Sequence, residues 1–364
     1  MGTSPIGLET QTEKLAKIKY SDNLPSLGGL RAVSILLVLI GHISGTAGVP
    51  KLDFYVGNYA HFGVVIFFVI SGFLITTLLL AEHARNGRVS LKLFYARRSI
   101  RIFPASYAYL AVVFVLSTLG IIHLRATDFW HAATYTVNYL PNAGWEIGHL
   151  WSLSVEEQFY LLWPFAFVML GPRRAIWVAV GVILLGPVAR SAAWLFLRKT
   201  PYADLSLFPL VADSLAMGCL LARLRTWLEA QQWYLRLLKP GVSMLILGAV
   251  FGINSFTDRT VVWVVGTSAI NLGIAILIHR SVYYDKDWMG RILNSKPLAL
   301  IGTLSYSLYV WQQLFLNRDS DKWMTAFPQN IIFSVISAMA SYWLLEKPLF
   351  QLRHRLRADY GKAA

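Results

Sequence analysis

The sequence has little charge and almost no cysteine. Only 14% of its 364 residues are charged, whereas soluble domains carry about a quarter. Its single cysteine, Cys219, lies inside an apolar run and supports neither a disulfide framework nor a cysteine metal site. We also expect no metal centre of another kind and no permanently bound cofactor.

A cleavable signal peptide and a second domain are also missing from the pattern. Residues 1–23 are polar and charged, and the first apolar run begins only near Leu30. No internal repeat, low-complexity tract or interdomain linker interrupts the chain. We expect an N-terminal tail over 1–24, one membrane domain over 25–348 and a C-terminal tail over 349–364.

Long apolar runs dominate what is present. Hydrophobic residues make up 56% of the chain and the mean hydropathy is +0.51. A helix needs about 20 apolar residues to cross a bilayer. The sequence therefore predicts an all-α, polytopic bundle of about ten transmembrane helices, at residues 30–47, 61–81, 103–122, 149–170, 174–197, 207–224, 240–256, 260–279, 298–316 and 330–346.

The positive charges indicate the orientation of this bundle. The net charge is +14, but Lys and Arg form short clusters between apolar runs rather than the continuous stripe that nucleic acid would need. If the N-terminus is cytoplasmic, 24 of these residues lie on that side and seven lie opposite. The positive-inside rule then predicts two cytoplasmic termini.

Arg31 and His42 are polar residues within the first predicted helix. Eleven residues at 100° each make three turns plus about 20°, so both side chains share one face, about 16 Å apart along the axis. A lone intramembrane histidine is often only a packed, hydrogen-bonded residue. Its pairing with an arginine on the same face favours a functional role.

Arg98 and Arg101 stand at i and i+3 where the third predicted helix leaves the cytoplasm, so they are neighbours on one helix face. Guanidinium groups suit phosphate oxygens. Positive-inside topology and anionic lipid binding are alternative explanations for these residues.

Glu156 and Glu157 lie about two turns into the fourth predicted helix, where a bare charge costs about 2.5–3.5 kcal/mol. Counted from the helix ends, Glu156 and His42 both fall in the outer half. A His42–Glu156 pair would orient the imidazole and stabilise its protonated form.

Two further features allow two interpretations each. Arg190 and Asp213 lie about seven residues from the outer ends of consecutive helices and predict either a buried ion pair or part of an acceptor cavity. The external segment 123–148, rich in aromatic residues, is a candidate lid or acceptor platform, or an ordinary interfacial loop.

Seven motifs in this order resemble the acyltransferase-3 family of membrane acyltransferases, which O-acylate bacterial surface sugars and macrolides. They cover the bundle from Leu30 to Pro348: Arg31 with ten residues before His42, Phe67-Phe-Val-Ile-Ser-Gly-Phe-Leu74, Arg98-x-x-Arg101, Trp151-Ser-Leu-Ser-Val-Glu-Glu-Gln-Phe-Tyr160, Asp213-Ser-Leu-Ala-Met-Gly218, Ser305-Tyr-Ser-Leu-Tyr-Val-Trp311 and Glu346-Lys-Pro348. One departure is that family members often carry His after the tryptophan, where this chain has Gln312.

The resemblance implies a multi-pass protein of the bacterial inner membrane, with cytoplasmic acyl-CoA, most simply acetyl-CoA, as co-substrate and a carbohydrate or glycolipid as acceptor. Because the chain ends about eighteen residues after its last predicted helix, we expect no fused extracytoplasmic hydrolase-like domain of the kind that some family members carry. His42 would be the general base and Glu156 its partner, although an acyl-histidine intermediate is an alternative. The remaining candidates divide into an acyl-CoA-binding set, Arg31, Arg98, Arg101, Ser305 and Tyr306, and an acceptor-binding set, Trp151, Glu157, Arg190, Asp213 and Gln312.

A proton-coupled transporter or lipid flippase is the alternative function, because buried Arg, His and Glu also form proton relays. Transporters commonly contain paired repeats with interrupted helices. The sequence shows no such repeat, which favours the enzyme.

Overall fold

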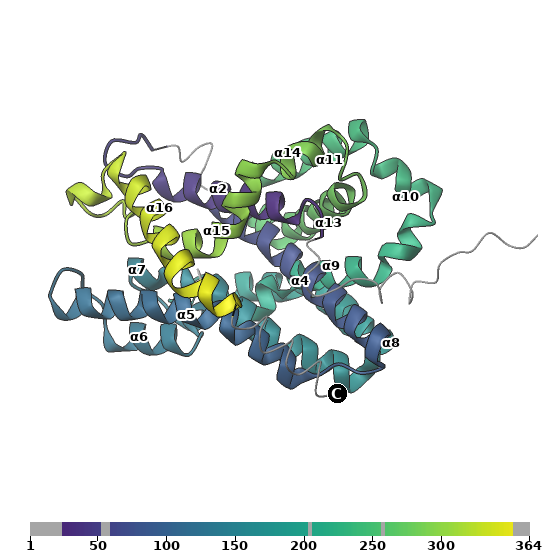
Figure 1. Ribbon diagram of the computed structural model, residues 1–364, viewed down its shortest axis with the longest axis horizontal. Helices are drawn as coiled ribbons and strands as arrows, with labels where there is room; N and C mark the ends of the chain where they lie inside the picture. Colours follow the sequence, from purple (N-terminus) through teal and green to yellow (C-terminus); the bar gives the residue numbers. More distant parts are fainter. Residues whose placement is uncertain (1–23, 52–58, 203–205, 256–258, 352–364) are drawn as a thin grey trace, which may run out of the picture.

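The computed structural model describes residues 24–51, 59–202, 206–255 and 259–351 (Figure 1). Within these ranges all regular structure is helical and no strand is present. Most of the two expected tails, 1–24 and 349–364, lies outside the described residues, so their bounds stay predictions.

Each of the ten stretches expected to be helical contains a helix. Those helices are α2 (Leu27–Ile43), α4 (Tyr59–Asn86), α5 (Leu91–Thr118), α8 (Leu150–Leu197), α9 (Phe208–Glu229), α11 (Pro240–Asn254), α12 (Arg259–Val261) continued by η2 (Val262–Gly266) and α13 (Thr267–Tyr283), α15 (Lys296–Gln312), and α16 (Gln329–Ser341) continued by η4 (Tyr342–Glu346). Short helices between them are α6 (Ala126–Ala133), η1 (Val137–Tyr139), α7 (Trp145–Gly148), α10 (Gln232–Leu237), α14 (Trp288–Leu293) and η3 (Trp323–Thr325).

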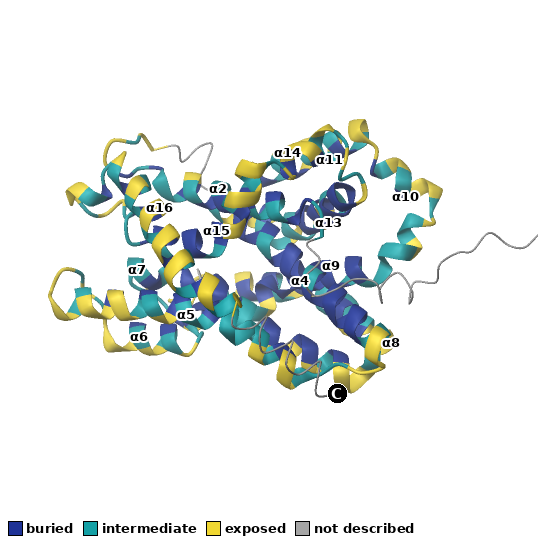
Figure 2. Ribbon diagram, in the orientation of Figure 1, coloured by how far each residue is buried: buried dark blue, intermediate teal, exposed yellow. Residues whose placement is uncertain are grey.

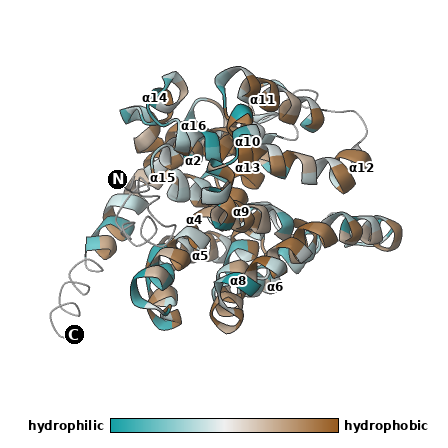
Figure 3. Cartoon of the chain, turned by 90° about the vertical axis from the view of Figure 1, so that its right-hand side faces the viewer, coloured by the Kyte–Doolittle hydropathy of each residue, from teal (hydrophilic) through white to brown (hydrophobic). Residues whose placement is uncertain are grey.

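The length and apolar composition of these helices indicate a multi-pass membrane protein. Four helical runs among the described residues are long and apolar enough to cross a bilayer: α4, α5, the α7–α8 run and the η2–α13 run. Large apolar side chains on α8, such as Leu184 and Phe196, are exposed on the outside of the bundle, where Figure 3 shows hydrophobic ribbon on outward faces. Lipid would cover these surfaces.

Helix α8 combines two of the predicted spans. Gly171 interrupts it with φ 74° and ψ 162°, a conformation that an L side chain rarely adopts. Pro172 follows and fixes the backbone at the start of the second half. The two halves correspond to the predicted spans 149–170 and 174–197.

Helix α5 begins twelve residues before the predicted start at 103. The Ser90 side chain accepts a hydrogen bond from the Leu93 amide at 3.4 Å and caps the helix. Lys92, Arg97, Arg98 and Arg101 interrupt the apolar residues of its first turns, which hid them from a search for apolar runs. As a result, Arg98 and Arg101 stand within a helix rather than in front of one.

The segment 123–148 is ordered rather than an irregular loop. It contains α6, η1 and α7, and Arg125 ties its ends together through Asp128 and the Asn142 carbonyl at 2.8 and 2.7 Å. Burial alone would raise the pKa of Asp128, but hydrogen bonds from Arg125 hold it below its ordinary value. Tyr107 donates to the Ala133 carbonyl and fastens α6 to α5.

Helix α4 runs through the middle of the molecule and is largely buried (Figures 1 and 2). It packs against α2 and α9, while α15 packs on α2 and α8 on α9. Glycine permits the closest of these contacts. A Cβ atom on Gly72 would lie 1.9 Å from the Leu215 carbonyl oxygen, and one on Gly218 would lie 2.1 Å from that of Val69. In the Ser71-Gly72 pair, Gly72 therefore permits close helix packing, whereas Ser71 lines the pocket described below.

We expect Gly72→Ala to destabilise the protein, because the added methyl group overlaps the α9 backbone. The cost should reach about 1–3 kcal/mol or more and appear as a lower melting temperature in detergent. Gly248→Ala is the matched control, since a Cβ on Gly248 of α11 meets nothing within 4 Å. Equal melting temperatures for the two variants would contradict this packing.

Candidate active site

A pocket with an empty volume of about 720 Å³ lies between five helices, α2, α4, α5, α8 and α15. Six of the predicted residues line it: Arg31, Arg98, Arg101, Glu156, Ser305 and Tyr306. The fold therefore gathers the whole predicted acyl-CoA-binding set at one place, from three helices distant in sequence, α2, α5 and α15.

The three arginines make the pocket strongly positive. Among the described residues, none of the guanidinium groups of Arg31, Arg98 and Arg101 makes a hydrogen bond or an ion pair. The guanidinium carbon of Arg98 lies 4.9 Å from the centre of the Tyr160 ring, a cation–π contact that leaves its N–H groups available. Three partly buried cations against one carboxylate favour an anionic ligand.

Glu156 is held at the wall of this pocket. Its Oε1 accepts hydrogen bonds from the Tyr160 hydroxyl, at 2.8 Å, and from the Ser71 hydroxyl. The pocket hydroxyls of α15 are committed as donors: Ser305 donates to the Gly302 carbonyl and Tyr306 to that of Ile102, at 2.8 and 2.6 Å. These two hydroxyls consequently present lone pairs, rather than protons, to a ligand.

We call the pocket lined by Arg31, Arg98 and Arg101 the arginine pocket. His42 does not line it and lies near the C-terminal end of α2. Its Nδ1 lies 2.9 Å from Oε1 of Gln312, and its ring meets that of Trp145 edge-on at 6.3 Å. Arg318 donates to the Gly41 carbonyl beside it at 3.4 Å.

The expected His42–Glu156 pair is not formed. Counting residues along a helix gives the height of a side chain but not the direction in which it points. The Glu156 carboxylate faces Ser71 on α4 and shares the pocket with Arg31, whereas His42 faces α15. The partner of His42 is Gln312, which the sequence placed among the residues expected to bind the acceptor.

Two other residues expected to bind the acceptor lie on α8. The Trp151 ring stacks on His61 with centroids 5.9 Å apart. Glu157 is partly buried, and its Oε1 has no hydrogen-bond partner among the described residues. Neither residue lines the arginine pocket.

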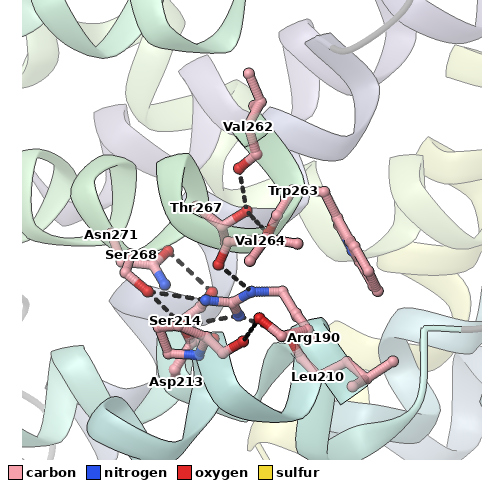
Figure 4. Close-up of polar contacts among 12 residues, drawn as sticks. Arg190, Leu210, Asp213, Ser214, Val262, Trp263, Val264, Thr267, Ser268 and Asn271 are labelled. Carbon is pink, nitrogen blue, oxygen red and sulfur yellow. Dashed lines mark hydrogen bonds and ion pairs between the residues drawn. The ribbon is translucent and has the colours of Figure 1, made fainter. Parts of the chain in front are cut away.

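Arg190 and Asp213 form a buried ion pair away from the pocket, with 2.9 Å between Nη1 and Oδ2 (Figure 4). Arg190 also donates to Ser268 and to the carbonyls of Leu210 and Val264, the last within the π-helical turn η2. Every guanidinium nitrogen therefore has a partner. The pair joins α8, α9, η2 and α13, which matches the structural interpretation, and an acceptor role for it stays a prediction.

Comparison with known proteins adds a family to this geometry. The sequence profile of an acyltransferase domain, acyltransferase 3, matches residues 24–346. The chain belongs to the acyltransferase-3 family. This confirms the resemblance indicated by the seven motifs. No solved structure gives a significant match to the chain.

The chain is similar to O-acetyltransferases of Listeria monocytogenes and Staphylococcus aureus. The chain is 28% identical to the peptidoglycan O-acetyltransferase OatA of Listeria monocytogenes over 89% of its own length and 54% of that protein. It is also 28% identical to the O-acetyltransferase OatA of Staphylococcus aureus, over 94% and 60% of the two chains. The chain thus spans less than two thirds of these relatives.

Several pocket residues of this acyltransferase-3 domain were not singled out as binding residues from sequence. Ser71, Ser152, Tyr160 and Tyr309 line the pocket, and all four belong to the family motifs. Their place in the family motifs was the sequence signal that could have identified them as pocket residues. Within the described ranges, no group of three His, Cys, Asp or Glu side chains is arranged to hold a metal ion.

If the Arg190–Asp213 pair is structural, Arg190→Met should lower stability by about 3–5 kcal/mol, because it leaves a buried carboxylate without its partner. The double variant with Asp213→Leu should recover most of this loss. Thermal unfolding in detergent measures both, with exposed Arg174→Ala as a control that changes little. A double variant as unstable as Arg190→Met would contradict the structural role.

Proposed function

We propose that the protein is a membrane O-acyltransferase that moves an acyl group, most simply acetyl, from acyl-CoA to a hydroxyl of a sugar-containing acceptor. The observation that carries this proposal is the convergence of three guanidinium groups at one end of α2, whose other end holds His42. Within the part of the chain that the structure describes, these groups have no ion-pair partner.

The arginine pocket suits the nucleotide end of the donor. The phosphates of coenzyme A would bind Arg31, Arg98 and Arg101, because planar guanidinium groups pair with phosphate oxygens through two bonds at once. Arg31 and His42 are about 16 Å apart along α2, a distance comparable to the extended pantetheine arm. The thioester would then lie beside His42.

The wall of the pocket suits the pantetheine arm. Its two amide N–H groups need acceptors once they leave water. Glu156 offers a carboxylate, and Ser305 and Tyr306 offer hydroxyl lone pairs because their protons point to backbone carbonyls. In this proposal Glu156 positions the acyl-CoA donor; it does not orient His42.

His42 then acts as general base. It takes the proton from the acceptor hydroxyl while that oxygen attacks the thioester carbonyl. A carbon–oxygen bond forms, the carbon–sulfur bond breaks, and the imidazolium returns the proton to the leaving thiolate, giving coenzyme A as a thiol. No covalent acyl-enzyme is required.

The membrane topology gives each substrate a side. We propose ten spans with cytoplasmic termini in the bacterial inner membrane, supported by the excess of Lys and Arg in alternate loops. The donor would enter from the cytoplasm at the arginine pocket, and the acceptor would approach His42 from outside. The name of the Listeria relative favours a cell-wall carbohydrate as acceptor.

Two variants should separate binding from chemistry. Arg101→Ala should raise the Kd for acetyl-CoA about 10- to 100-fold, because it removes a charge-assisted hydrogen bond to phosphate. His42→Ala should lower kcat by at least about 100-fold and leave that Kd unchanged. Calorimetry on protein in nanodiscs gives Kd, and mass spectrometry of the acylated product gives kcat.

Arg88→Ala is the matched control for this experiment, because Arg88 is exposed in the turn between α4 and α5 and lies outside the pocket. It should change neither constant. The enzyme proposal fails if the protein does not bind acetyl-CoA, or if His42→Ala keeps normal turnover.

A further inference from the structure

A chain of buried amides leads away from His42. Nδ1 of His42 contacts Oε1 of Gln312 at 2.9 Å, and Nε2 of Gln312 donates to Oε1 of Gln313 at 3.2 Å. Nε2 of Gln313 then donates to the backbone carbonyl of Trp145 at 3.0 Å. Gln312 is fully buried and Gln313 is 4% exposed, so water does not compete for these bonds.

The hydrogen bond to the Trp145 carbonyl fixes the orientation of both glutamine side-chain amides. A backbone carbonyl can only accept a hydrogen bond, so the group of Gln313 that faces Trp145 must be its amide NH₂. The oxygen of Gln313 then faces Gln312 and requires a donor there. Turning either amide by 180° would bring two oxygens or two NH₂ groups together.

Gln312 therefore presents its oxygen to His42. An oxygen that only accepts needs a proton on the facing ring nitrogen, Nδ1. In a neutral imidazole the second nitrogen, Nε2, then carries the lone pair. The tautomer of His42 follows from a carbonyl three hydrogen bonds away.

We propose that Gln312 is a positioning residue that, with Gln313, holds neutral His42 as its Nδ1–H tautomer, so that Nε2 is the proton-accepting atom. This inference rests on the proposed function for its catalytic meaning. The amide performs the orienting task that a carboxylate performs in a serine-protease triad, but without adding charge.

This series of hydrogen bonds also connects His42 to the segment 123–148. Trp145 belongs to α7, its indole N–H donates to the Gln313 carbonyl at 3.1 Å, and Arg318 lies over its ring at 5.4 Å. Among the described residues, the charged and titratable groups that interact electrostatically with His42 are Arg318 and His149, neither of which is a carboxylate.

Nitrogen NMR of protein in nanodiscs tests the tautomer directly. In ¹⁵N-histidine-labelled protein, the signals lost in His42→Ala identify His42. We expect a protonated, pyrrole-type Nδ1 and an unprotonated, pyridine-type Nε2 in the neutral state. A neutral His42 protonated on Nε2 would overturn the inference, whether or not His42 is the base.

Turnover of Gln312 variants tests the consequence. Gln312→Leu has nearly the same volume but no acceptor, and it should lower kcat about 10- to 100-fold with an unchanged KM for acetyl-CoA. Gln312→Glu should restore kcat to within about 10-fold of the wild type, because a carboxylate accepts from Nδ1 whichever way Gln313 turns. Its charge should move the acid limb of the pH profile to higher pH, since it favours the imidazolium.

Asn271→Leu serves as the control for loss of a buried amide. Asn271 is fully buried in α13 and accepts a hydrogen bond from Ser214, away from His42. It should leave the His42 nitrogen shifts and the pH profile unchanged. Equal kcat values for Gln312→Leu and Gln312→Glu would contradict the positioning role, whereas normal turnover by His42→Ala would contradict the proposed function alone.

Discussion

Three guanidinium groups that lie together, with no ion-pair partner in the described part of the chain, set the main constraint on this structure. Arg31, Arg98 and Arg101 repel one another inside a pocket that the single carboxylate of Glu156 only partly offsets. Such an arrangement costs free energy in a low-dielectric interior, and favourable packing elsewhere in the protein has to offset this cost. The glycine contacts between α4 and α9, and those of α2 with α4 and α15, provide a close-packed frame that holds the three charges in place.

Buried arginines elsewhere in the described residues are paired with carboxylates. At three other places a buried arginine or carboxylate has an opposite charge beside it: Arg190 with Asp213, Arg280 with Asp287, and Arg97 with Glu82. Those pairs join helices. A pocket that keeps three arginines available, while buried arginines elsewhere are paired, favours an anionic ligand.

Much of this could be predicted from the sequence because the relevant signals are local. Apolar runs located a helix in each expected range, and the i, i+3 spacing of Arg98 and Arg101 placed them on one face. The predicted start of α5 was wrong because Lys and Arg residues interrupt its first turns. The break within α8 was visible only as Gly171 followed by Pro172.

The contacts between helices could not be predicted in the same way. The His42–Glu156 pair failed because height along a helix does not determine the direction of a side chain. Gln312 was assigned to the acceptor because a neutral amide carries no catalytic signal by itself. Its role depends on Gln313 and on a backbone carbonyl of Trp145, about 170 residues away in sequence, and no residue pattern encodes that contact.

A structure of the protein in nanodiscs with a non-transferable thioether analogue of acetyl-CoA tests the central claim most directly. The account predicts phosphates within hydrogen-bond distance of Arg31, Arg98 and Arg101, a pantetheine arm along Glu156 and Tyr306, and the acyl carbon beside Nε2 of His42. Phosphates bound elsewhere, or an acyl group at the opposite end of α2 from His42, would contradict it.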